Sequence, residues 1–313
     1  MPKCTLCGAI RGLGEHCADG HPEVKIHSQT YVYTDYRNNL IVDPDNAAIR
    51  RKAERDPRIA HENSEDALTW NVFRGLQCLK ALDGVSAQLF GTTGPVEAYF
   101  WTVSAKGETW QPLLQALGVL EAHIPSQGQR SEPDLVLVNE KGRRFVFIEA
   151  KFGASVRESN LPDWFLAKGE AYTPKYRDRI LANYQKGNPD QTLFASELSL
   201  AQVISEGFYQ LMRHALFANY ITRNGGCQGW QWTLCSLISP STNPDQPAQC
   251  RAFRMLLAPR WREHYRFLTW RDMYEAIPMA ARHSRADGEL QQSLADYLEN
   301  KTYNGEAANL IVG

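Results

Sequence analysis

Residues 131–153 read SEPDLVLVNEKGRRFVFIEAKFG and contain two apolar runs rich in Val, Ile and Phe. The charged stretch NEKGR separates the two runs, which is typical of a β-hairpin. If a four-residue loop at 140–143 closes the hairpin, Val138 pairs with Phe145. The stretch therefore predicts two adjacent antiparallel strands.

Three charged side chains are expected at one end of this hairpin. Because alternate residues of a strand face the same side of a sheet, Glu149 and Lys151 share a face, and the register places Asp134 opposite Glu149. Adjacent buried carboxylates repel each other unless positive charge lies between them. Mg²⁺ or Mn²⁺ supplies that charge and prefers hard oxygen ligands. With a lysine nearby to orient or help deprotonate a water molecule, the cluster has the parts of a phosphodiester-hydrolysing site.

The same residues resemble the PD-(D/E)XK, or restriction-endonuclease-like, nuclease superfamily. Pro133-Asp134 matches the first half of its motif, and Glu149-Ala150-Lys151 matches the second half across the hairpin. The resemblance implies an α/β fold in which helices flank a central mixed sheet. It also implies a metal-dependent nuclease, in which Asp134 and Glu149 hold Mg²⁺ or Mn²⁺ and Lys151 positions the attacking water.

Two neighbouring helices carry further candidates that the resemblance points to. Many members have an acidic residue on the first helix that assists metal binding, and Glu65 fits that position, with Glu62 as its rival. Exonuclease-like members carry a Gln on the helix after the motif, and Gln210 fits that position. Their Gln-x-x-x-Tyr pattern becomes Gln210-x-x-x-His214 in this sequence, which leaves the sub-branch open. Arg213 and His214 are candidates for substrate contact, and packing inside the protein is the alternative.

Hydrophobic periodicity predicts the other elements of the fold. We expect helices at residues 64–80, 110–119, 199–222, 270–277 and 286–302, and strands at 87–93, 97–103, 230–239 and 252–258. The order of these elements by itself indicates an α/β fold around a mixed sheet.

The chain is expected to consist of four parts. They are a zinc-binding module at 1–30, a linker or surface segment at 31–60, a nuclease-like domain at 61–285, and a C-terminal helix and tail at 286–313. Within the nuclease-like domain, residues 153–198 are interpreted as an insertion. An insertion of this length is usually functional rather than a simple connection.

The first 30 residues contain a pattern that is typical of zinc sites. The candidate ligands are Cys4, Cys7, Cys17 and His21, and His16 and His27 are alternatives for the fourth position. Tetrahedral Zn²⁺ requires such a set of sulfur and nitrogen ligands. A segment this short cannot bury its own core, so the metal would supply its folding energy. We expect structural zinc because protein side chains fill all four positions; the alternative is three ordinary thiols near a flexible terminus.

The composition excludes several classes of protein. The 313 residues include 34 Lys+Arg and 35 Asp+Glu, and 43% of them are hydrophobic. These values exclude disordered, fibrous and uniformly basic proteins, but they permit a local basic groove. The sequence has no signal-peptide pattern and no apolar run that could span a bilayer, and its seven cysteines do not form a disulfide framework. We therefore expect a cytoplasmic protein without membrane association.

The favoured function is a DNA endonuclease, and its setting in prokaryotic defence or restriction follows from the resemblance alone. Cleavage of RNA, structure-specific cleavage and exonuclease action are alternatives within the same fold. A non-catalytic nucleic-acid-binding or scaffold protein is the alternative from another functional class. The resemblance also allows a homodimer. Because the sequence has no GxxxxGK[ST] motif, any helicase or ATPase partner would be a separate polypeptide.

Overall fold

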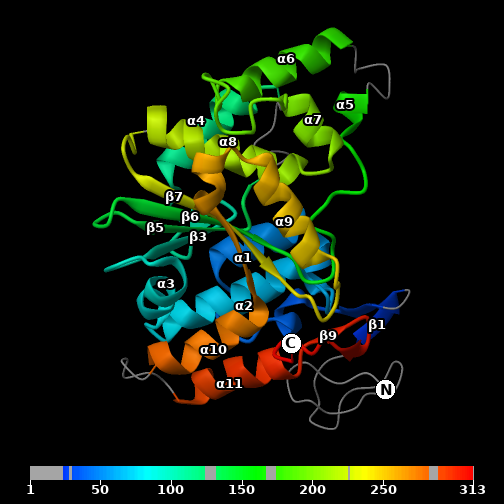
Figure 1. Ribbon diagram of the computed structural model, residues 1–313. Helices are drawn as coiled ribbons and strands as arrows, with labels where there is room; N and C mark the ends of the chain where they lie inside the picture. The colour runs from blue at the N-terminus through cyan, green and yellow to red at the C-terminus, as the bar shows by residue number, and fades with distance from the viewer. Residues whose placement is uncertain are drawn as a thin grey trace.

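A computed structural model describes residues 24–27, 30–123, 132–166, 174–224, 226–281 and 288–312. Within these ranges, a six-stranded mixed sheet forms the centre of the protein and helices cover both of its faces (Figure 1). The strands lie in the order β4 (Val103–Ser104), β3 (Glu97–Phe100), β5 (Leu135–Asn139), β6 (Arg144–Ala150), β7 (Gln231–Ile238) and β8 (Tyr265–Thr269). This architecture agrees with the expected α/β fold.

The hairpin at the middle of the sheet has the register that the sequence predicts. Strands β5 and β6 are antiparallel, and Val138 pairs with Phe145. Strand β3 continues the antiparallel part beside β5, whereas β7 and β8 run parallel to β6. The change from antiparallel to parallel pairing occurs at β6, which therefore lies between two different halves of the sheet.

The two faces of β6 contribute to two different hydrophobic cores. Phe145 and Phe147 lie in one core, whereas Val146 and Ile148 lie in the other. A strand that is buried on both faces is a nearly continuous apolar run, as observed here. The charged residues that follow this run are consequently held at a fixed place by packing on both sides.

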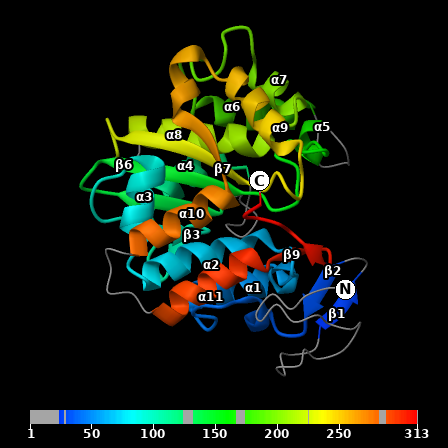
Figure 2. The same ribbon diagram turned by 60° about the horizontal axis from the view of Figure 1, so that its bottom comes forward.

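Five helices cover one face of the sheet. They are α1 (Ala47–Arg55), α2 (Glu65–Cys78), α3 (Leu82–Phe90), α10 (Trp270–Ala281) and α11 (Gly288–Glu299), and Figure 2 shows α11 alongside α2. Helix α2 confirms the prediction for residues 64–80. The Ser64 side chain accepts a hydrogen bond from the backbone N–H of Ala67 and caps the helix. Leu68, Val72 and Leu76 form its buried stripe.

Helices on the opposite face build the second core. They are α4 (Gln111–Leu120), α5 (Asp163–Leu166), α6 (Pro174–Gln185), α7 (Leu200–Ser205), α8 (Tyr209–Asn224) and α9 (Gln246–Leu256). The segment interpreted as an insertion at 153–198 takes part in this core, because Ile180, Tyr184 and Phe194 are buried there.

Short elements connect and close the structure at its ends. They are β1 (Val24–His27), β2 (Thr30–Tyr33), the 3₁₀ helices η1 (Tyr36–Asn39), η2 (Pro57–Ala60) and η4 (Pro259–His264), and the hairpin β9 (Thr302–Tyr303) and β10 (Glu306–Ala307). Ala308 and Leu310, which follow this hairpin, are buried in the same core as α2.

Two predicted strands are wrong. Residues 87–90 belong to helix α3, which ends where Gly91 adopts a φ of 66°. Residues 252–256 belong to α9, whose buried Cys250 and Phe253 follow the three-residue spacing of a helix face. Strand β8 is not among the predicted strands, and its sequence YRFLT lies in a run rich in arginine.

The helix predicted over 199–222 is interrupted. It consists of α7 and α8, and Gly207 between them adopts a φ of 81°, a conformation that disfavours other residues. The break starts a new helix at Tyr209, so Gln210 lies in its first turn. Among the described residues, none of the helices is both long enough and apolar enough to cross a membrane.

Replacing Leu68 by Ala should destabilise the fold, because this side chain is fully buried on the central stripe of α2. We expect the free energy of unfolding to fall by about 2–5 kcal/mol in chemical denaturation. The matched control is Cys78→Ala, at an exposed position of the same helix, which should change it by less than about 0.5 kcal/mol. Equal effects of the two substitutions would contradict the placement of α2.

Candidate active site

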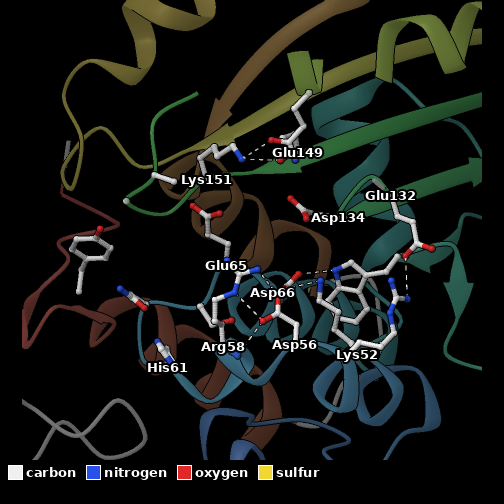
Figure 3. A pocket seen from close by; sticks show the side chains of 18 residues that line it. Lys52, Asp56, Arg58, His61, Glu65, Asp66, Glu132, Asp134, Glu149 and Lys151 are labelled. Carbon is white, nitrogen blue, oxygen red and sulfur yellow. Dashed lines mark hydrogen bonds and ion pairs between the residues drawn. The ribbon is translucent and has the colours of Figure 1, made fainter. Parts of the chain in front are cut away.

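A pocket of about 580 Å³ opens at the carboxyl end of β6, and its wall is densely charged. In Figure 3, Glu149 and Lys151 lie on its upper side, Glu65 and Asp66 lie on its lower side, and Asp134 lies between them. The carboxylates in the wall are Asp56, Glu65, Asp66, Glu132, Asp134 and Glu149, and the Lys and Arg side chains are Lys52, Arg55, Arg58 and Lys151. The charged end of the predicted hairpin thus forms part of a larger polar cavity.

The two motif carboxylates lie beside each other, as the hairpin register predicts. Asp134 directly precedes β5, and its Oδ2 accepts a hydrogen bond of 2.8 Å from the backbone N–H of Ala150. Burial, the neighbouring Glu149 carboxylate and Asp66 raise the pKa of Asp134 well above its usual value. Burial and the two neighbouring carboxylates therefore disfavour the ionised form of Asp134.

Glu149 is almost completely buried, with 1% of its surface exposed. Its Oε1 accepts a hydrogen bond of 2.8 Å from Lys151 Nζ. Among the described residues, no donor makes a hydrogen bond to its Oε2, which lies 3.5 Å from His214 Nδ1. Burial raises the pKa of Glu149, and Lys151 opposes that rise. One oxygen of this buried carboxylate therefore has no hydrogen-bond donor in the described part of the chain.

Lys151 is held by its backbone and by its side chain. Its N–H donates to the carbonyl of Leu237 at 2.7 Å, and its own carbonyl accepts from Trp270 Nε1 at 3.2 Å. Its Nζ donates to Gln210 Oε1 at 3.1 Å as well as to Glu149. Burial opposes the charge of Lys151, but the surrounding carboxylates outweigh burial and raise its pKa. Lys151 is therefore a protonated, oriented donor at neutral pH.

The two acidic candidates before and within α2 occupy different environments. Glu65 lines the pocket, and its Oε1 accepts a hydrogen bond of 2.7 Å from the backbone N–H of Phe152. Glu62 is buried outside the pocket wall and accepts hydrogen bonds of 2.6 Å from Thr302 Oγ1 and from the N–H of Gly305. Glu65 therefore occupies the site, whereas Glu62 anchors the C-terminal hairpin.

Arg213 and His214 lie behind the pocket. Arg213 forms a buried ion pair of 2.7 Å with Glu121. His214 is fully buried next to Glu149, and burial lowers its pKa well below the usual value, so that the ring is neutral. Neither residue belongs to the pocket wall, so their positions correspond to the packing alternative for these two side chains.

Two of the pocket carboxylates are candidate ligands for a metal ion. No three Cys, His, Asp or Glu side chains converge as a ready-made metal site in the part of the chain that the structure describes. The pair Asp134 and Glu149, with the unbonded Glu149 Oε2, nevertheless fits a cation that binds few protein ligands and keeps several waters. Mg²⁺ has this preference. The predicted zinc ligands Cys4, Cys7, Cys17 and His21 lie outside the described residues.

Sequence reasoning missed several residues of the pocket wall. Asp66 accepts a hydrogen bond of 2.7 Å from Trp101 Nε1 and forms an ion pair of 3.0 Å with Lys52 Nζ. Tyr303 comes from a segment that was interpreted as a polar tail. The acidic doublet of Glu65 and Asp66 directly after a helix cap was a usable signal for Asp66, whereas no local pattern indicated Lys52 or Tyr303.

Replacing Asp134 by Asn should stabilise the metal-free protein at neutral pH. The raised pKa means that the Asp134 carboxylate opposes folding once it is ionised, and Asn can still accept the hydrogen bond from Ala150. We expect the free energy of unfolding to increase by about 0.5–2 kcal/mol, measured in chelator by chemical denaturation. The gain should disappear below about pH 4, because the carboxyl is then protonated in both the folded and the unfolded state.

The control for this substitution is Asp178→Asn, which changes an exposed carboxylate on α6. It should leave the free energy of unfolding within about 0.5 kcal/mol of the original value. A loss of stability in Asp134→Asn at neutral pH would contradict the electrostatic description of the site.

A family model described as "Restriction Endonuclease associating with ARP" (REase-ARP) matches residues 14–301. The matched range contains the hairpin, α2 and α8, and therefore every residue described above as part of the site except Tyr303. No curated protein and no solved structure matches the chain.

Proposed function

The chain belongs to the REase-ARP family of restriction endonucleases, and on this basis we propose that it is a metal-dependent nuclease that hydrolyses phosphodiester bonds. The observation that carries the proposal is the convergence of Asp134, Glu149 and Lys151 in one pocket, through hydrogen bonds of 2.8 Å from Ala150 to Asp134 and from Lys151 to Glu149. We propose that Pro133-Asp134 and Glu149-Ala150-Lys151 are the two halves of a PD-(D/E)XK motif. DNA is the favoured substrate, and restriction or defence in a prokaryote is the favoured setting.

Asp134 and Glu149 would hold Mg²⁺ or Mn²⁺ in this proposal, with Glu65 in a supporting position. The cation would neutralise the two carboxylates and offset the charge that develops on the scissile phosphate. The neighbouring carboxylates Glu149 and Asp66, which together with burial raise the pKa of Asp134, support this assignment. Glu65 would contribute less to metal binding, because its Oε1 already accepts a hydrogen bond from the N–H of Phe152.

Lys151 would orient the attacking water or a phosphate oxygen. An ammonium group has three N–H donors. Lys151 Nζ uses two of them in its hydrogen bonds to Glu149 and Gln210. The third can point into the pocket, which Lys151 lines. Gln210 would support this geometry, because its own N–H donates to Glu158 Oε1 at 3.1 Å and holds the start of α8 near the site.

The description of the family supplies the partner in this proposal. It names association with ARP, so we propose ARP as a protein partner of this chain and nucleic acid as its substrate. A homodimer and a separate helicase or ATPase polypeptide remain expectations from the sequence.

A structural zinc ion is a separate part of the proposal. The spacing of Cys4, Cys7, Cys17 and His21 supports it, since four such ligands complete a tetrahedral site. Metal analysis of the purified chain should find about one zinc per molecule, and replacing Cys4 and Cys7 together by Ser should abolish it. Clearly substoichiometric zinc in undamaged protein would contradict this assignment.

The nuclease proposal predicts loss of cleavage on substitution of the motif. With Mg²⁺ or Mn²⁺, the unmodified chain should cleave plasmid, single-stranded DNA or RNA, and these three substrates establish which nucleic acid is cut. Lys151→Ala and Asp134→Ala should each lower the rate at least about 100-fold, because they remove a water-orienting donor and a metal ligand. Chelation of the divalent cation should stop cleavage completely.

A matched control is available on the surface. Lys106 and Glu97 form a lysine–carboxylate pair of 3.7 Å outside this pocket, and Lys106→Ala should leave the rate unchanged. Cleavage that persists in both Lys151→Ala and Asp134→Ala would reject the proposal. Binding of nucleic acid without any cleavage would favour the non-catalytic alternative.

A further inference from the structure

Three cationic side chains line one wall of the pocket and come from consecutive turns of the chain. Lys52 and Arg55 are three residues apart on α1, and Arg58 follows after another three residues in η2. Lys52 and Arg55 therefore lie on the same face of α1, with Cβ atoms about 5–6 Å apart, and Arg58 lines the same pocket from η2. We call these three residues the cationic strip.

Each member of the cationic strip pairs with a carboxylate that is less exposed than itself. Lys52 pairs with Asp66 at 3.0 Å, with side-chain exposures of 19% and 16%. Arg55 pairs with Glu132 at 3.6 Å, with exposures of 33% and 12%. The largest contrast is in the third pair, Arg58 with Asp56 at 2.7 Å, with exposures of 78% and 18%.

The wall of the pocket carries more acidic than basic side chains. The six carboxylates in the wall outnumber its four Lys and Arg side chains, so the pocket without the cationic strip would repel a polyanion. A nuclease site must accept the phosphates on either side of the scissile one. The cationic strip is the part of the wall that can attract them, and it lies in the same pocket as Lys151.

Resting on the proposed nuclease function, we propose that the cationic strip binds consecutive non-scissile phosphates of the substrate strand, which displace Asp66, Glu132 and Asp56 from their cations. The ligand chemistry is the sugar–phosphate backbone, which DNA and RNA share. Such contacts fix the register of a strand without reading its bases.

The Arg58 pair shows how a carboxylate can release its cation without loss of local structure. Asp56 also caps η2, because its Oδ1 accepts a hydrogen bond of 3.1 Å from the backbone N–H of Arg58. Asn is as good a cap as Asp, so Asp56→Asn removes the charge and keeps the turn. The pair can therefore be tested from both of its sides.

The two substitutions should have opposite effects on binding. We would measure the affinity for fluorescently labelled single-stranded DNA and RNA oligonucleotides by anisotropy, with Ca²⁺ in place of Mg²⁺, over a series of salt concentrations. Arg58→Gln should weaken binding about 3- to 10-fold. It should also reduce the magnitude of the negative slope of log affinity against log salt concentration by about 0.7–1. Asp56→Asn should strengthen binding several-fold, because it releases Arg58 from a competing anion.

The chain contains a matched control with the same local motif. In η1, Asp35 caps the 3₁₀ helix and pairs with Arg37 at 2.9 Å, and neither residue lines the pocket. Arg37→Gln and Asp35→Asn should therefore leave both the affinity and the salt slope unchanged. Arg55→Gln and Lys52→Gln test the other two positions and should each act in the direction of Arg58→Gln.

Opposite shifts at Arg58 and Asp56 support the proposal, and the strand for which they occur identifies the substrate as DNA, RNA or both. The proposal is overturned if both substitutions shift the affinity in one direction, if they match the Arg37 and Asp35 controls, or if the unmodified chain binds neither strand. The assay involves no cleavage, so failure of the nuclease proposal would appear separately, as binding without hydrolysis in Mg²⁺.

Discussion

The site depends on the repulsion between two carboxylates that lie side by side at the end of β6. Asp134 and Glu149 are held there by the hairpin register and by the bond from Ala150, and burial raises the pKa of each. Lys151 supplies compensation to Glu149. In the proposed metal-dependent function, a cation between the carboxylates would neutralise the remaining negative charge.

The surrounding fold keeps this unfavourable arrangement in place. Strand β6 is buried on both faces, so Phe147 and Ile148 fix the strand that ends in the site. Helix α2 begins beside it and presents Glu65, while the break at Gly207 starts α8 so that Gln210 reaches Lys151. Hydrophobic packing on both sides of the sheet thus offsets the electrostatic cost of the pocket.

The centre of the site could be predicted from sequence because period-two alternation fixes the register of a short hairpin, and Asp134 and Glu149 follow from it. The helix over 252–256 could not be predicted in the same way, since an apolar run of that length fits a strand or a helix equally well. The opposite wall of the pocket was missed for another reason. Lys52, Arg58 and Tyr303 come from distant segments, and only tertiary packing brings them to the hairpin.

We propose that Asp134 and Glu149 together hold a divalent cation for phosphodiester hydrolysis. The most direct measurement is anomalous X-ray scattering from crystals of the chain soaked in Mn²⁺. We expect an anomalous peak within bonding distance of a carboxylate oxygen of both residues, and loss of that peak in Asp134→Asn. A well-ordered pocket without such a peak, in which Glu149 remains bonded to Lys151 alone, would contradict it.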